Sequence, residues 1–161
     1  MLTIKDTTKS KYLDFEMMER LLRFATDGRL SKDVTINIIV SDRTLDRLTV
    51  GDYEMQAILY RTPMRNVYSL FIRKSPATSL MSIAFHEATH LIQYESGRLS
   101  MDESMKKCSW DGVEYTADYP YMKRPWEVEA FKEQRRLEKE WRALQKSLKK
   151  VRKSLFGKKS K

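Results

Sequence analysis

The stretch Met81-Ser-Ile-Ala-Phe-His86-Glu87-Ala-Thr-His90-Leu-Ile-Gln-Tyr94 decides how the rest of the chain is interpreted. It contains the pattern His-Glu-x-x-His, and both histidines of the chain fall in this pattern. Residues four apart lie on one face of a helix, so His86 and His90 can direct ring nitrogens at one tetrahedral zinc ion (Zn2+). Glu87 stands one step round the helix, where a carboxylate can accept a proton from a zinc-activated water. The stretch therefore predicts a zinc site with Glu87 as the general base.

The residues around this pattern favour a buried helix. Glu87 is the one formally charged side chain between positions 78 and 94. A helix that is apolar almost all round is buried, and buried His and Glu side chains need partners, which a metal ion supplies. Ser75 is the expected N-cap with Pro76 in the first turn, and Gly97 lies just beyond the expected end.

The segments before this helix alternate between helical and strand patterns. β-branched residues with a half-alternating pattern predict strands, and short links between neighbouring strands predict antiparallel pairing. No clear period emerges at 41–50. The expected elements are a polar segment at 1–13 that lies on the surface or frays, a helix from Asp14 to Gly28 capped by Asp14, a strand at Val34–Val40, and paired strands at 53–60 and 66–73.

An N-terminal helix, a small and mostly antiparallel sheet, and a buried His86-Glu87-x-x-His90 helix resemble the core of the zincin metallopeptidases. The resemblance covers about residues 14–135. It implies an α+β fold with a metallopeptidase domain at 1–135, which acts on a peptide or protein substrate. In zincins an edge strand just before the active-site helix lies beside the cleft and pairs with extended substrate. By position, that strand is 66–73 here.

Two histidines leave a zinc site incomplete, because a catalytic zinc usually has three protein ligands and a water. The chain has no third histidine. The extended metzincin pattern needs Gly and His where this chain has Gln93 and Ser96, so that subclass is excluded. The third ligand is therefore expected to be a carboxylate, or less readily Cys108.

The segment Pro125-Trp-Glu127-Val-Glu129-Ala130-Phe131 carries the best carboxylate candidates. Its Glu-x-x-Ala spacing is similar to the glutamate helix of gluzincins, and Arg-Pro-x-Glu-x-x-Ala after His-Glu-x-x-His resembles small zincin proteins of phages and mobile elements. The resemblance implies Glu127 as the third ligand, with Glu129 as the alternative. Phe131 stands where many gluzincins have an Asp that orients a histidine, so that support must come from elsewhere, for example from Glu129. Minor candidates for the ligand are Asp111, Glu114 and Asp118.

An aromatic segment at 108–121 lies between the two candidate metal-binding segments. Asp111-Gly112 is a turn signal, so a small hairpin or an ordered loop is expected beside the cleft. Tyr115, Tyr119 or Tyr121 could donate a hydrogen bond to the oxyanion of a peptidase reaction. Simple packing is the alternative interpretation of each of these tyrosines.

The C-terminal part of the chain is strongly basic. Residues 132–161 hold 13 Lys/Arg and three Glu, against a net charge of +9 for the whole chain, so the remainder is close to neutral. Apolar residues spaced 4, 3, 4, 3 and 4 apart predict a basic amphipathic helix, assigned here as an extension at 136–161, whose stripe at 137–155 packs on the body, on a second copy or on another protein. Binding of nucleic acid or another polyanion, attachment to an anionic membrane surface, and a merely solvated face are the open interpretations of the basic side chains. The candidate polyanion-binding residues are Lys146, Lys149, Lys150, Arg152 and Lys153.

Several classes of protein are excluded or disfavoured by composition. No apolar run approaches the length of about 20 residues that spans a bilayer. The N-terminal residues lack the apolar segment of a signal peptide, and Cys108 is alone, so no intrachain disulfide can form. These features favour the cytoplasm of the producing cell, or a virion if the protein is phage-encoded. The leading hypothesis is a zinc-dependent peptidase, and the alternative is a non-catalytic zincin-fold interaction protein.

Overall fold

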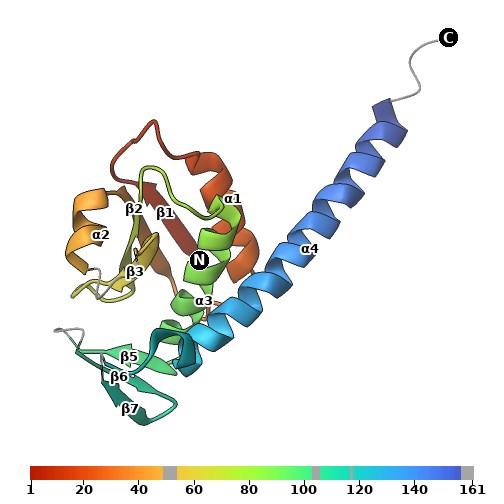
Figure 1. The fold of residues 1–161 in the computed structure, drawn as a ribbon. Coiled ribbons are helices and arrows are strands. Elements are labelled where there is room, and N and C mark those ends of the chain that lie inside the picture. Colours follow the sequence, from red (N-terminus) through yellow and green to blue (C-terminus); the bar gives the residue numbers. More distant parts are fainter. Residues whose placement is uncertain (49–53, 103–105, 117, 157–161) are drawn as a thin grey trace.

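A mixed β-sheet with helices packed against it forms the body of the protein in the computed structural model (Figure 1), which describes residues 1–48, 54–102, 106–116 and 118–156. The fold is α+β, as expected. Among the described residues the elements are β1 (Leu2–Asp6), α1 (Phe15–Thr26), β2 (Val34–Val40), α2 (Asp42–Leu48), β3 (Ala57–Arg61), β4 (Val67–Ile72), α3 (Leu80–Glu95), β5 (Leu99–Met101), β6 (Lys107–Trp110), β7 (Val113–Thr116), the 3-10 turn η1 (Tyr121–Lys123) and α4 (Pro125–Phe156).

The four-stranded sheet has the order β1-β2-β4-β3. β2 pairs in parallel with β1 and with β4, and β3 pairs antiparallel with β4. The expectation of a mostly antiparallel sheet is therefore wrong for this sheet. One reason is that the chain crosses over through α1 between β1 and β2. The other is that the hairpin of β3 and β4 folds back and places β4, not β3, next to β2.

The first strand corrects the expectation that residues 1–13 are surface or frayed throughout. Leu2 is buried, and the strand aligns Leu2 with Val34 of β2. The guanidinium of Arg23 in α1 donates to the Leu2 carbonyl oxygen at 2.9 Å. A short edge strand of this kind alternates only weakly in sequence, so its pairing depends on the presence of β2.

The antiparallel pairing of the second and third expected strands is confirmed, but their places in the sheet were not anticipated. β4 lies in the sheet interior, where Tyr68, Leu70 and Ile72 are almost fully buried. β3 is the edge strand, so the assignment of 66–73 to the edge beside the cleft is wrong. β3 begins at Ala57, and the expected start at 53 lies outside the described residues.

The expected N-cap is confirmed for the first helix and is wrong for the helix with the two histidines. Asp14 caps α1 as expected, and its carboxylate accepts from the Met17 amide at 3.0 Å. The helix with the two histidines begins at Leu80 and not near Ser75, because Ser79 is the N-cap and accepts from the Ser82 amide at 3.1 Å. The undecided segment at 41–50 contains the short helix α2.

The aromatic segment forms the expected hairpin. β6 and β7 pair antiparallel around Asp111 and Gly112, whose φ values of +48° and +83° are those of a type I′ turn. β5 completes a three-stranded antiparallel sheet below the main sheet (Figure 1).

Helix α4 packs on α3 over its first part and then leaves the body (Figure 1). It runs without a break through the boundary proposed at 135/136. Leu137 is 3% exposed, and the Trp141 ring meets the Phe24 ring of α1 edge-on at 5.1 Å. None of the described helices is both long enough and apolar enough to cross a membrane.

Candidate metal centre

Helix α3 holds the two histidines on one face. Its other faces are covered by the body, so Phe85 and Leu91 are fully buried on either side of the pattern. The Nε2 atoms of His86 and His90 lie 3.1 Å apart, and the two rings are nearly perpendicular at 83°. Two ring nitrogens so close together are directed at a common point, as the spacing of four residues predicts.

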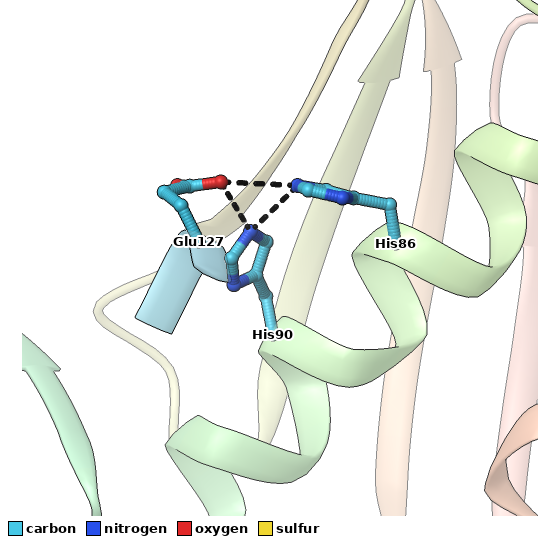
Figure 2. Close-up of side chains that lie close together, drawn as sticks. All are labelled: His86, His90 and Glu127. Carbon is cyan, nitrogen blue, oxygen red and sulfur yellow. Dashed lines mark hydrogen bonds and ion pairs between the residues drawn. The ribbon is translucent and has the colours of Figure 1, made fainter. Parts of the chain in front are cut away.

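Glu127 reaches the same point from the first turn of α4. Its Oε2 atom lies 3.1 Å from Nε2 of His86 and 3.5 Å from Nε2 of His90, and Figure 2 shows the carboxylate and both rings converging. Pro125 begins the helix, and Ala130 is 0% exposed because α4 packs closely on α3 there. The structure therefore brings together His86, His90 and Glu127.

The separations within this group fit a metal ion. Donor atoms about 2.0 to 2.1 Å from a tetrahedral ion lie about 3.3 Å from one another. The three donor separations here are 3.1, 3.1 and 3.5 Å. His86, His90 and Glu127 are all nearly buried, and the group could bind a metal ion.

Without a metal ion, His90 and Glu127 shift one another's pKa values. Burial opposes protonation of His90, but the Glu127 carboxylate outweighs it and raises the His90 pKa to about 9. Burial likewise favours the neutral form of Glu127, and the two histidines overcome this and hold its pKa far below its usual range. Among the described residues, the buried Nδ1 of His86 has no hydrogen-bond partner. A metal ion bound to Nε2 of His90 would take the place of a proton there.

Gln93 orients His90, and sequence reasoning missed this role. Its Oε1 accepts from Nδ1 of His90 at 2.8 Å, while its Nε2 donates to the Trp126 carbonyl at 3.0 Å and to Glu129 Oε2 at 2.8 Å. Because both of the latter partners only accept, the amide can be oriented in one way. Nδ1 therefore carries the proton, and the Nε2 lone pair of the neutral ring points into the group. The sequence feature that could have predicted this contact is the position of Gln93 three residues after His90, on the same face of the helix.

Glu129 lies outside the group and supports Gln93 instead. Its carboxylate accepts from the Arg98 guanidinium at 2.8 and 3.1 Å, and Arg98 also pairs with Asp111 in the β6–β7 turn at 3.0 Å. The alternative ligand Glu129 therefore contacts Gln93, which in turn contacts His90, and it does not join the metal-binding group. The support that Phe131 does not provide comes through Gln93 and Glu129.

Phe131 packs directly against the site. Its ring centroid lies 4.6 Å from that of His86. The Tyr121 ring meets Phe131 edge-on at 6.4 Å, so Tyr121 lies near the group. The Tyr119 ring meets Tyr115 edge-on at 5.1 Å, and Tyr119 is 38% exposed.

Glu87 points toward the edge strand. It is 6% exposed, and its Oε2 accepts from the Leu59 amide of β3 at 2.8 Å. A buried carboxylate is thus held between the metal-binding face of α3 and the edge of the sheet. Cys108, in β6, and the minor candidates Asp111, Glu114 and Asp118 lie outside the group.

Comparisons with protein-family models, with curated proteins and with solved structures find no match to this chain.

Proposed function

We propose that this protein is a zinc-dependent peptidase, or another hydrolase with the same arrangement. The observation that carries the proposal is the buried triangle of His86, His90 and Glu127 donors with a carboxylate, Glu87, on the next position of the same helix. Two histidines and one carboxylate are a donor set typical of catalytic zinc, and it leaves a position for water.

The chemistry divides between the ion and the residues of the chain. A bound zinc ion polarises a scissile carbonyl and lowers the pKa of water. His86, His90 and Glu127 hold the ion, and Gln93 keeps His90 in the tautomer that can bind it. Glu87 accepts the proton of the attacking water and passes it to the leaving amine.

The edge strand offers a place for the substrate backbone. Among the described strands β3 has a neighbour, β4, on one side only, and its Leu59 amide points outward to Glu87. An extended peptide that added to this edge would lie beside Glu87, and its backbone would bond to that of β3. The resemblance assigned this pairing with the substrate to 66–73, and we assign it to β3, Ala57–Arg61.

Two measurements on the 161-residue chain test the proposal. Metal analysis after purification from zinc-replete medium should find about one zinc per chain, and His86→Ala, His90→Ala and Glu127→Ala should each lose it. Glu87→Gln should keep the zinc and abolish cleavage of a mixed peptide library. Glu114→Gln, which removes an exposed carboxylate from β7, is the matched control and should cleave normally. Cleavage by Glu87→Gln at the wild-type rate would exclude Glu87 as the base.

A non-catalytic interaction protein is the second candidate, and the apolar stripe of α4 favours it. Leu137 and Trp141 already pack on the body, whereas Leu144, Leu148 and Val151 are 40%, 53% and 55% exposed. A truncation should therefore begin at Arg142, which spares the packed part of α4. Loss of a protein complex on truncation, with zinc bound but no cleavage of any library peptide, would favour this candidate. The location, in the cytoplasm of the producing cell or in a virion, stays a prediction.

A further inference from the structure

The part of α4 beyond Trp141 carries a second feature that the metal centre does not use. A groove of about 660 Å³ runs along it. The groove is lined by Met81 of α3 and, along α4, by Trp141, Arg142, Gln145, Lys146, Lys149, Lys150 and Lys153. Figure 1 shows this part of α4 extending from the body with no other element packed on it.

The four lysines form one continuous cationic face. Their positions follow i, i+3, i+4 and i+7, which is one side of a helix. All four are exposed, and none has an ion-pair partner within the part of the chain that the structure describes. Arg142 does have one, Glu138, at 3.3 Å. From Trp141 to the end of the sequence there is no Asp or Glu.

Like charges at these spacings repel one another in a helix. Between positions 146 and 153 four pairs of lysines stand three or four residues apart, and the body supplies no described carboxylate to compensate them. A ligand with a regular array of negative charges would turn this repulsion into attraction. The charge on the face therefore points to a polyanion.

The position of the apolar stripe distinguishes a nucleic acid from a membrane surface. At about 100° per residue, the four lysines centre on the side of α4 opposite to Leu144, Leu148, Val151 and Leu155. A flat bilayer that received the apolar stripe would leave these lysines pointing away from its phosphates. A nucleic acid can lie in the groove and contact the lysines alone.

We propose that the groove lined by Lys146, Lys149, Lys150 and Lys153 binds the phosphodiester backbone of a nucleic acid without base specificity. Lysine is suited to phosphate contacts as a point charge, and Gln145 is the one groove residue whose amide could read a base edge. Binding does not involve the zinc site. If the chain is the peptidase proposed above, this binding places it next to nucleic acid and next to proteins that are bound to the nucleic acid.

The test measures binding of the full chain to a fluorescent duplex of about 20 base pairs as a function of salt. Four phosphate contacts predict a slope of log K against log salt near −3.6, which is a loss of about 150-fold in affinity between 50 and 200 mM. Replacing Lys146, Lys149, Lys150 and Lys153 by Gln should reduce affinity at 50 mM by at least about 100-fold and flatten this slope.

A second variant controls for net charge. Lys5, Lys32, Arg43 and Arg65 are exposed cations of the body, and their replacement by Gln removes the same charge. This variant should retain binding within about threefold, and His86→Ala should bind as the wild type does, which separates this inference from the zinc proposal. Circular dichroism should show that all the variants are folded.

Three results would overturn the proposal. One is a wild-type protein that does not bind the duplex at 50 mM salt. Another is an equal loss in both four-site variants, which would mean that net charge alone drives binding. The third is lysine-dependent binding to vesicles of phosphatidylserine and phosphatidylcholine that exceeds binding to the duplex, which would identify a membrane surface as the ligand.

Discussion

Replacement of Gln93 by Leu tests whether the buried amide controls metal affinity. Leu fills most of the same volume and removes the acceptor for His90 Nδ1 together with the donors to the Trp126 carbonyl and Glu129. The histidine then loses the contact that fixes its tautomer and ring orientation. The metal-binding atoms of His86, His90 and Glu127 are unchanged.

The expected magnitude follows from the position of the amide. Loss of a group that orients a metal-binding histidine typically costs about 10- to 100-fold in metal affinity, which is about 1.4 to 2.7 kcal/mol. Gln93 is 2% exposed, so water reaches its partners poorly, and it is the described partner of His90 Nδ1. We therefore expect a loss in the upper half of this range. The metal-free protein should lose about 1 to 3 kcal/mol of stability, because the buried Nδ1–H of His90 is left without its acceptor.

The assay is competition for zinc against a chromophoric chelator, with urea unfolding of the metal-free protein in parallel. Gln134→Leu is the matched control, because Gln134 bonds Glu138 within α4 at 3.0 Å and does not contact the metal centre. It should bind zinc as the wild type does. Zinc affinity of Gln93→Leu within twofold of the wild type, in a folded protein, would refute the role assigned to Gln93.

Three further predictions concern packing, capping and thiol reactivity. Ala130→Leu should destabilise the protein by about 1 to 3 kcal/mol in urea unfolding and weaken zinc binding, because Ala130 is 0% exposed where α4 meets α3, whereas Ala143→Leu on the exposed part of α4 should leave both nearly unchanged. Asp14→Ala should cost about 1 kcal/mol through loss of the α1 cap, and an unchanged urea midpoint would contradict the cap assignment; Asp27→Ala, at the other end of α1, is the control. Burial raises the Cys108 pKa from 9.0 to about 11, so at pH 8 the fraction of thiolate in the folded protein is about one hundredth of the usual fraction. Iodoacetamide should therefore label Cys108 slowly, and the rate should rise toward pH 11. Labelling as fast as in the urea-unfolded protein would show that the thiol is not shielded.

The comparison of expectation with structure is clearest in the two glutamates of α4. Glu127 and Glu129 are two residues apart and point to different sides of the helix. The resemblance favoured Glu127, and the packing of Trp126 and Ala130 against the body turns Glu127 toward the histidines and Glu129 toward Gln93 and Arg98. The residue spacing left two candidate carboxylates. The contact between α3 and α4 places Glu127, and not Glu129, beside the two histidines.

The sequence by itself determined the features that depend on neighbouring residues. The common face of His86 and His90, the cap at Asp14, the strand at Val34–Val40 and the turn at Asp111-Gly112 follow from local geometry and conformational preference, which a short segment contains. The basic face of α4 also follows from helical spacing alone.

Only the tertiary structure decided the features that join distant segments. β1 became a strand because β2 lies beside it, and β3 became the edge because the buried side chains of β4 require a neighbour on each side. Gln93 acquired its role because the first turn of α4 brings a carbonyl and a carboxylate to its amide. Such pairings depend on which surfaces bury the most apolar area together, and a local pattern does not contain that information.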